Sequence, residues 1–240
     1  MDSMVSLKDA REYLLNLPRQ LDEFLDDDYR KGLNALLDKF EEYFNIVASV
    51  NLRSSEDRII DATEATEISD YGFVLLLKLI DLMERLDLPH KRKEIEQISL
   101  VFARWTISYN GTINYLEPVV NAIAQLANLM KEREALLALS ELIADIVDHC
   151  SLELKKDQFG DNEEFHPWRL LHVNRGIVAT RTHDLEVMKQ AFDEFLIYLP
   201  QQATGFFAEG MKEMDALDYP PHVRKVMEFY FHQNPSVRVH

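Results

Sequence analysis

The sequence predicts an all-α protein built from antiparallel helix hairpins. Seven glycines and eight prolines make up 15 of the 240 residues, about half of the usual share of ~12%, so the chain has few of the turns that an all-β or α/β fold requires. Apolar residues recur at steps of three and four, for example Leu33, Leu36, Leu37 and Phe40, and this spacing places them on one face of a helix. No comparable run alternates strictly between apolar and polar residues.

Apolar periodicity and the prolines together divide the chain into twelve predicted helices. Prolines such as Pro18, Pro89 and Pro167 come near the start of an apolar-periodic segment, where the missing backbone N–H costs least. The polar stretch at 153–165, which contains Gly160, is predicted to be a loop between two blocks of helices. The predicted helices lie near 6–16, 18–26, 28–50, 55–66, 68–87, 90–109, 113–130, 132–149, 167–181, 184–198, 200–216 and 220–232.

The spacing of these helices predicts hairpins that stack on one another. From about residue 68 onward a helix begins every ~17–20 residues after a short connection, and a hairpin period of ~35–40 residues is typical of helical solenoids. We therefore predict an N-terminal helical part at 1–66 packed on the rest, hairpins at 67–152 and further hairpins at 166–232, all within one continuous structural domain. Such hairpins can form a regular solenoid or an irregular array, and both arrangements stay open.

The C-terminal part of this pattern resembles a tetratricopeptide repeat. Gly176 and Ala179 stand where that family has small residues that let two helices approach. The segment 183–185 (His-Asp-Leu) occupies the turn, which in the family usually reads glycine, aspartate and an apolar residue. Phe192 matches the aromatic residue of the second helix, and Pro200 matches the closing proline. One unit is thus matched at 168–200.

The chain also departs from the tetratricopeptide pattern. His183 replaces the turn glycine, Met188 and Phe195 replace residues that are normally alanine, and only a weaker echo is found at 109–128, where Asn110-Gly111 supplies the turn. The resemblance implies an array from about 68 to 232 that holds peptides or partner proteins on a concave face. The matching positions are structural, so the resemblance assigns no ligand-binding residue. On this interpretation Asp184 or Thr182 caps the following helix and His183 has no chemical role.

Adjacent histidine and aspartate on a helical scaffold also resemble the metal-dependent HD phosphohydrolases. That family gathers histidines and aspartates from several helices around one or two divalent ions, which activate water against a phosphate ester. Imidazole and carboxylate suit such ions and leave open positions for water and phosphate. The neighbours of the pair, Thr182 and Leu185, depart from the family's pattern. The candidate metal ligands are His149, His166, His172, His183, Asp184 and Asp215.

Two further residue types carry packing predictions. Gly205 and Gly210, with the small residues around them, should let the helix at 200–216 lie close against its partner. Cys150, the only cysteine, excludes an internal disulfide and a multi-cysteine zinc site. Because it ends an apolar stripe, it is predicted to be buried and structural.

Charge and hydropathy narrow the expected partners. The net charge is 26 − 42 = −16, and because phosphate backbones and anionic lipid are bound through clustered Lys and Arg, neither nucleic acid nor a membrane surface is expected as a partner. The longest apolar run, 73–83, contains Lys78 and Asp81 and is shorter than the ~20 residues that span a bilayer, so it predicts a buried helix. No N-terminal stretch has the order of a secretion signal, which makes the cytoplasm the expected location.

Together these patterns favour a non-catalytic helical-repeat scaffold that mediates protein–protein or peptide interaction. No catalytic or cofactor-binding residue and no cofactor is assigned, and the alternative is the metal-dependent hydrolase. The scaffold predicts a groove lined by successive hairpins, whereas the enzyme predicts at least three of the six candidate ligands in one cavity. The aromatic stripe of the long helix at 28–50 also suggests a homodimer.

Overall fold

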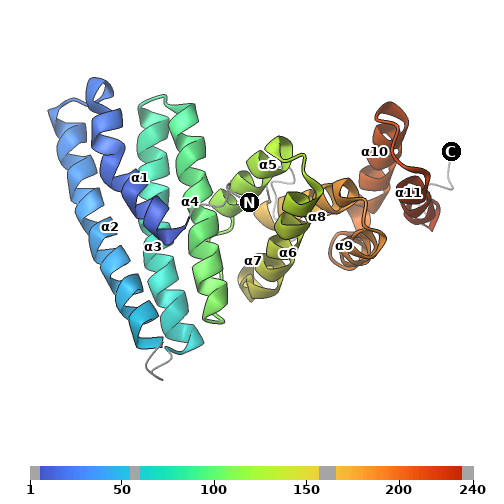
Figure 1. The fold of residues 1–240 in the computed structure, drawn as a ribbon, viewed down its shortest axis with the longest axis horizontal. Helices are drawn as coiled ribbons and strands as arrows, with labels where there is room; N and C mark the ends of the chain where they lie inside the picture. The colour runs from blue at the N-terminus through green and yellow to red at the C-terminus, as the bar shows by residue number, and fades with distance from the viewer. Residues whose placement is uncertain (1–5, 55–59, 157–165, 234–240) are drawn as a thin grey trace. The chain divides into compact units, whose positions relative to one another are not determined.

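The computed structural model describes residues 6–54, 60–156 and 166–233, and this part of the chain is almost entirely helical (Figure 1). Eleven α-helices and two 3-10 turns lie among the described residues, and the strand-like pairing there is one isolated bridge between Ile113 and Cys150. The predicted all-α class is confirmed. Within the described ranges, no helix combines the length and the apolar character needed to cross a bilayer.

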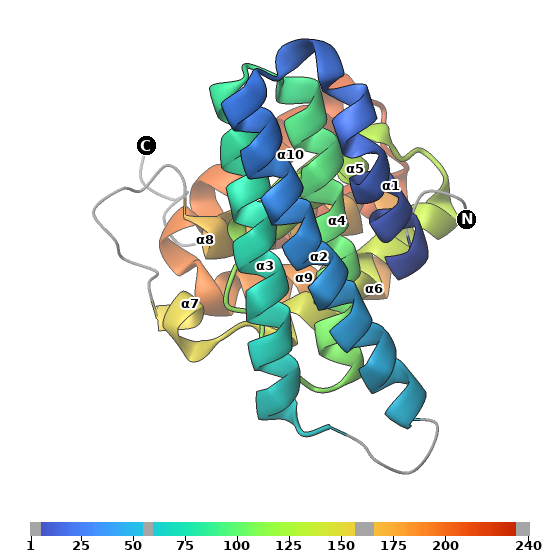
Figure 2. The same ribbon diagram turned by 90° about the vertical axis from the view of Figure 1, so that its left-hand side faces the viewer.

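Four helices of the N-terminal half form a closed bundle (Figures 1 and 2). They are α1 (Leu7–Gln20), α2 (Asp27–Ser54), α3 (Ala62–Arg85) and α4 (Pro89–Ser108). Helix α2 packs on α1 and α3, α4 packs on α3, and α1 also packs on α4, which completes the ring. Each helix can therefore bury an apolar face against two neighbours.

Polar side chains join the first and last helices of this bundle. The Tyr13 hydroxyl donates to the Glu94 carboxylate at 2.7 Å, and the Lys91 ammonium donates to the Gln20 side-chain carbonyl at 2.6 Å. The Lys91 Nζ also lies 5.8 Å from the centre of the Tyr13 ring, within the range of a cation–π contact. These contacts close the bundle along the edge where α1 meets α4.

Aromatic side chains fill the centre of the bundle. The Phe102 ring of α4 lies 4.8 Å from the Tyr43 ring of α2 and 5.9 Å from the Phe73 ring of α3, measured between centroids. The stripe of α2 that suggested a homodimer is therefore buried inside the chain's own bundle, and the homodimer stays a prediction. The buried residues of this stripe are Leu33, Leu37, Phe40, Tyr43, Phe44 and Val47, and Leu36 is partly buried. The predicted burial of the apolar run at 73–83 is confirmed for Phe73, Leu75, Leu76, Leu79, Ile80 and Met83.

Two predicted helix boundaries in this region are wrong. Helix α1 continues through Pro18 to Gln20, because a proline in the last turn removes a single helical hydrogen bond and leaves the rest of the helix intact. Instead of a helix at 18–26, the chain forms a 3-10 turn at Asp22–Phe24. The Asp26 carboxylate then accepts the backbone N–H groups of the residues two and three positions later, at 3.0 and 2.8 Å, and so caps α2.

The two helices predicted at 55–66 and 68–87 are a single helix over the described residues. Helix α3 runs without interruption from Ala62 to Arg85, and its N-cap Asp61 accepts the backbone N–H of Glu64 at 2.8 Å. No glycine, proline or cap residue separates the two predicted segments, so nothing stops the helix between them. Residues 55–59 of the predicted helix lie outside the described residues.

The segment that follows α4 is a loop rather than the start of the next helix. Helix α5 (Glu117–Leu129) begins four residues later than predicted. The backbone N–H of Ile113 donates to the His149 carbonyl at 2.8 Å, and the N–H of Ser151 donates to the Ile113 carbonyl at 3.0 Å. The backbone N–H of Thr112 donates to the Thr66 hydroxyl of α3 at 2.8 Å. These hydrogen bonds hold the loop in an extended conformation. In a helix, the same backbone groups could not reach these partners.

The last four helices form two hairpins. After α6 (Arg133–His149) and the short α7 (Leu152–Lys156) come α8 (Pro167–Thr182) and α9 (Leu185–Tyr198), joined by a two-residue turn. The last pair, α10 and α11, covers Ala203–Ala216 and Pro221–Gln233. A 3-10 turn, Pro200–Gln202, links the two hairpins. The segments 67–152 and 166–232 were predicted to contain such hairpins.

The chain divides into two compact units. Among the described residues, the first unit comprises 6–54, 60–125 and 145–156, and the second comprises 126–144 and 166–233. These units follow spatial contacts, so their limits fall within α5 and α6 rather than between the consecutive segments suggested by the sequence.

Four turns share one unusual backbone conformation. Asp87, Asn110, His183 and Asp218 have φ angles of 53°, 55°, 56° and 50°, and they follow α3, α4, α8 and α10. This left-handed region favours glycine, and aspartate, asparagine and histidine are the other residues that enter it most readily. His183 thus adopts a backbone conformation that favours glycine, and the tetratricopeptide resemblance, which predicts a glycine there, stays a prediction.

Candidate functional site

The first three candidate metal ligands have different surroundings. His149 ends α6, and its ring Nδ1 lies 2.8 Å from the Asp145 carbonyl. His166 stands at the N-cap position of α8, where its side chain makes no capping hydrogen bond. His172 is buried within α8, with its ring 4.4 Å from the Trp168 ring and 4.9 Å from the Tyr198 ring. None of the three contacts another candidate through these interactions.

The other three candidates have structural partners at helix ends. His183 lies in the turn after α8, with its ring 5.4 Å from the Tyr219 ring. Burial lowers the pKa of His183, and the nearby charges of His222 and Arg133 lower it further. Asp184 accepts the first backbone N–H groups of α9 at 3.1 and 3.3 Å, so its predicted capping role is confirmed. Its other oxygen forms an ion pair with Arg133 at 3.2 Å.

Asp215, the last candidate, pairs with Arg224 at 2.5 Å. Over the residues that the structure describes, no three His, Cys, Asp or Glu side chains lie close enough together to hold a metal ion. The arrangement that the hydrolase alternative requires, three of the six candidates in one place, is thus not found in this part of the chain. Burial of Cys150 is confirmed, and it raises the pKa of the thiol to about 12, which keeps the thiol protonated and unreactive.

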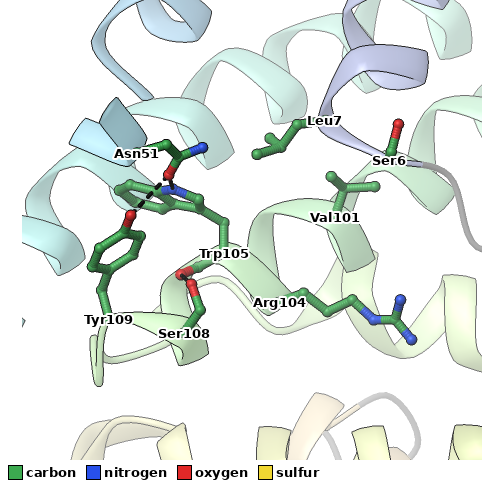
Figure 3. Close-up of a pocket in the computed structure, with 8 residues that line it drawn as sticks. All are labelled: Ser6, Leu7, Asn51, Val101, Arg104, Trp105, Ser108 and Tyr109. Carbon is green, nitrogen blue, oxygen red and sulfur yellow. Dashed lines mark hydrogen bonds between the residues drawn. The ribbon is translucent and has the colours of Figure 1, made fainter. Parts of the chain in front are cut away.

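A pocket in the first unit is the candidate binding site (Figure 3). Its volume is about 440 Å³, within the range of ~300–1,000 Å³ that ligand pockets occupy. It lies where the start of α1, the last turns of α2 and the last turns of α4 meet. The lining residues are Ser6, Leu7, Asn51, Val101, Arg104, Trp105, Ser108 and Tyr109.

Helix periodicity explains why α4 supplies most of the wall. Val101, Arg104, Trp105, Ser108 and the C-cap residue Tyr109 follow one another at steps of three, one, three and one, so they share one face of the helix. On this face the Trp105 and Tyr109 rings lie 5.1 Å apart. The periodicity therefore places one cationic and two aromatic side chains together at the C-terminal end of α4.

Asn51 fixes the aromatic end of the pocket. Its side-chain oxygen accepts hydrogen bonds from the Trp105 indole N–H at 3.0 Å and from the Tyr109 hydroxyl at 2.9 Å (Figure 3). An amide oxygen that accepts two donors sets the orientation of the whole amide group, so the NH₂ group of Asn51 is on the other side. That NH₂ group can only donate hydrogen bonds.

The two serines of the pocket already use their hydroxyl protons. The Ser6 hydroxyl donates to the Asp9 carboxylate at 2.6 Å, in addition to the two backbone hydrogen bonds of the capping box of α1, and the Ser108 hydroxyl donates to the Trp105 carbonyl at 2.7 Å. Arg104 is the charged residue among the described residues that line the pocket. Burial lowers its pKa, but a guanidinium stays protonated in proteins.

Sequence analysis singled out none of these eight residues as a site. Arg104, Trp105 and Tyr109 show a basic residue beside aromatic ones at helical spacing, which was the available signal. Asn51 comes 54 residues before Trp105, so no local pattern connects them. The contact depends on how far α2 runs alongside α4, and only the packed bundle determines this.

Comparison with known proteins gives no match: no family model, no curated protein and no solved structure matches the chain. A functional assignment therefore depends on the contacts and charges of the chain's own residues.

Proposed function

We propose that this protein is a non-catalytic helical scaffold that binds a protein or peptide partner. The observation that supports this most strongly is the side-by-side packing of the two C-terminal hairpins, α8–α9 and α10–α11. The second helices of the hairpins, α9 and α11, pack on each other. Arrays built from repeated hairpins present extended surfaces that bind partner molecules.

The first helices of the two hairpins also approach closely. A Cβ atom added at Gly176 of α8 would overlap the tip of the Phe206 ring of α10. The Phe206 ring is stacked on Phe195 with a centroid distance of 4.4 Å. First helix on first helix and second on second is the packing expected of a tetratricopeptide-like array, and Gly176 is one of the small residues on which that resemblance depends.

The turn between α8 and α9 adds a second point of similarity. His183 adopts the φ of the family's glycine, and Asp184 caps the second helix as the family's aspartate would. Thr182 supports the turn, because its hydroxyl accepts the backbone N–H of Asp184 at 3.1 Å and donates to the Ala179 carbonyl at 2.6 Å.

Large apolar side chains on this unit offer contact points for a partner. Ile197 of α9 is 70% exposed and Phe229 of α11 is 55% exposed. Exposed apolar residues are common singly, so these two serve here as positions where a partner can be tested.

The test is reconstitution with a purified partner. Proteins captured from the source cells by the full chain are purified, and their affinity is measured by calorimetry for the wild type, Ile197→Asp and Phe229→Asp. We expect a stoichiometric complex that one of these substitutions weakens at least tenfold, since each places a charge at an apolar contact. Lys212→Ala is the matched control, because Lys212 is an exposed residue of the same unit in a surface pair with Glu209. The proposal fails if no purified candidate forms a saturable complex.

The metal-dependent hydrolase stays the alternative function. A proposal for it requires three of the six candidate ligands in one place, and the described residues do not bring three together. Elemental analysis of protein purified without a histidine tag or chelator tests it directly. One or two transition-metal ions per chain, lost on His183→Ala, would favour the hydrolase over the scaffold.

A further inference from the structure

The pocket of the first unit has an unusual charge for this protein. The chain carries 42 acidic and 26 basic side chains, yet among the residues that the structure describes the pocket lining contains one arginine and no acidic residue. A cation at a partly buried site acts through a lower effective dielectric than bulk water, so its attraction for an anion is stronger there. The lining therefore favours a negatively charged group over a positive one.

The pocket also favours a ligand that accepts hydrogen bonds. The oxygen of Asn51 is already occupied by Trp105 and Tyr109, so the amide presents its two N–H donors. The hydroxyl protons of Ser6 and Ser108 are already donated within the chain. A guanidinium such as that of Arg104 has five N–H donors, and their arrangement matches a carboxylate. Five donors are more than one partner can use.

The two donor groups lie at opposite ends of an apolar wall. Figure 3 shows Asn51 on one side and the Arg104 guanidinium on the other, with Leu7, Val101 and Trp105 between them. A suitable ligand thus carries an anion at one end, an acceptor such as a peptide carbonyl at the other, and an apolar group between. An apolar C-terminal residue of a peptide has this order of groups: the preceding peptide carbonyl, the side chain and the carboxylate.

We infer that this pocket binds a carboxylate carried by an apolar peptide segment, with the carboxylate at Arg104, a peptide carbonyl at Asn51 and an apolar side chain against Leu7, Val101 and Trp105. This inference rests on the proposed role as a peptide- or protein-binding scaffold and names the chemistry of the ligand. The carboxylate can come from the C-terminus of a peptide or from an acidic side chain.

Three labelled peptides distinguish these sources. The first is a six-residue glycine–serine peptide that ends in valine and leucine with a free carboxylate. The second is the same peptide with a C-terminal amide, and the third is an amide with a glutamate before the valine. Binding to the full chain is followed by fluorescence polarisation of the label. We expect the first or the third peptide to bind at least tenfold more tightly than the second, and the preferred one identifies the source of the carboxylate.

Two substitutions test the pocket itself. Arg104→Met removes the charge but keeps the length of the side chain, and should weaken carboxylate binding at least tenfold while leaving the neutral amide unchanged. Asn51→Asp keeps an oxygen for Trp105 and Tyr109 but replaces the NH₂ donors with a negative charge, so it should also weaken binding at least tenfold. Arg11→Met is the matched control: Arg11 pairs with Glu41 on the surface of the same unit, so the same loss of charge should have no comparable effect. Circular dichroism confirms that each variant is folded.

Equal binding of all three peptides, or no binding of any peptide at millimolar concentration, would overturn the inference. So would carboxylate binding that Arg11→Met weakens as much as Arg104→Met and Asn51→Asp do. These results are separable from a failure of the scaffold itself. A purified partner that still binds the chain, and is insensitive to Arg104→Met and Asn51→Asp, would leave the proposed function standing without this pocket.

Discussion

The two units of the chain use similar aromatic centres in different helix arrangements. In the first unit, helices of up to 28 residues close into a ring, because α1 returns to pack on α4. In the second unit, α9, α10 and α11 have 14, 14 and 13 residues, and each hairpin packs on the next one. The longer helices α2, α3 and α4, of 28, 24 and 20 residues, can cover one another along a whole face, and the 14-residue α1 completes the ring. The short hairpins of the second unit depend instead on the neighbour that follows them.

The units also differ in how polar groups join their helices. In the first unit, the buried Glu96 of α4 accepts hydrogen bonds from Arg92, Asn121 and Gln125 at 3.0, 2.9 and 2.6 Å. In the second unit, Arg175 of α8 forms a two-pronged ion pair with Glu194 of α9, including one hydrogen bond of 2.8 Å. A carboxylate with several close partners tolerates the loss of one. Arg175, in contrast, is almost fully buried and depends on the single carboxylate of Glu194.

The largest expected effect comes from the aromatic centres. Phe102 in the first unit and Phe207 in the second are fully buried, and replacing a phenylalanine of this kind with alanine costs about 3–5 kcal/mol. Trp105 and Trp168 are the only tryptophans of the chain, one in each unit, so urea unfolding in Trp168→Phe and Trp105→Phe backgrounds reports each unit by fluorescence. We expect Phe102→Ala to shift the Trp105 transition and Phe207→Ala to shift the Trp168 transition. An unchanged transition in the mutated unit would contradict the assigned core.

Removing these polar contacts should reduce the free energy of unfolding more in the second unit than in the first. Glu194→Ala leaves the Arg175 side chain, which is 4% exposed, without its carboxylate and should cost about 3–5 kcal/mol. Glu96→Ala should cost less, about 1–3 kcal/mol, because the donors that it leaves are partly exposed and water can reach them. Arg92 also keeps its ion pair with Glu84. The free energies of unfolding from the same urea experiments check this order, and an equal loss for both variants would refute it.

Glycines test how closely helices approach in each arrangement. Gly176→Ala in α8 should destabilise the second unit by about 1–3 kcal/mol, since the added methyl group overlaps a stacked Phe206 ring. Gly205→Ala in α10 is the matched control: a Cβ there meets no atom within 4 Å, so the gain in helix propensity should stabilise by about 0.5–1 kcal/mol. Gly72→Ala gives the comparison in the first unit, where the Cβ would lie 2.6 Å from the buried Tyr43 ring. Thermal unfolding in which the Gly176 and Gly205 variants change alike would argue against the close α8–α10 contact.

Sequence reasoning succeeded where the determining contacts are local. The helical class follows from apolar spacing. The capping role of Asp184 follows from its position directly before the helix that begins at Leu185. The tight packing predicted at Gly205 and Gly210 is half right. A Cβ at Gly210 would lie 2.7 Å from the Met227 sulfur, whereas the space at Gly205 is open. Which glycine faces a neighbour depends on the rotation of α10 about its axis, and periodicity alone does not determine this.

The same limit explains the loop at 110–116 and the pocket. Apolar residues such as Ile113 and Leu116 continue the helical spacing of α5, but contacts to α3 and to the segment after α6 keep the first of them extended. The pocket depends on Asn51 meeting Trp105 across the bundle. Long-range pairs of this kind follow from the packing of whole helices, so the spacing of residues in one segment cannot predict them.

The smallest expected effect concerns pH and is confined to the second unit. Burial, with the charges of His222 and Arg133, lowers the pKa of His183 below its ordinary value of 6.5, so the unfolded chain binds this proton more readily than the folded one. Stability from this group is fully present above the unfolded pKa and is lost as the pH falls through the lower, folded pKa. His183→Asn keeps a side chain that tolerates the φ of 56° and removes the titration. Urea midpoints of the Trp168 transition at pH 7.5 and 5.5 should therefore differ less in His183→Asn than in the wild type. An equal difference would show that His183 does not contribute to the acid sensitivity of the turn, and that its histidine is tolerated there for its backbone conformation alone.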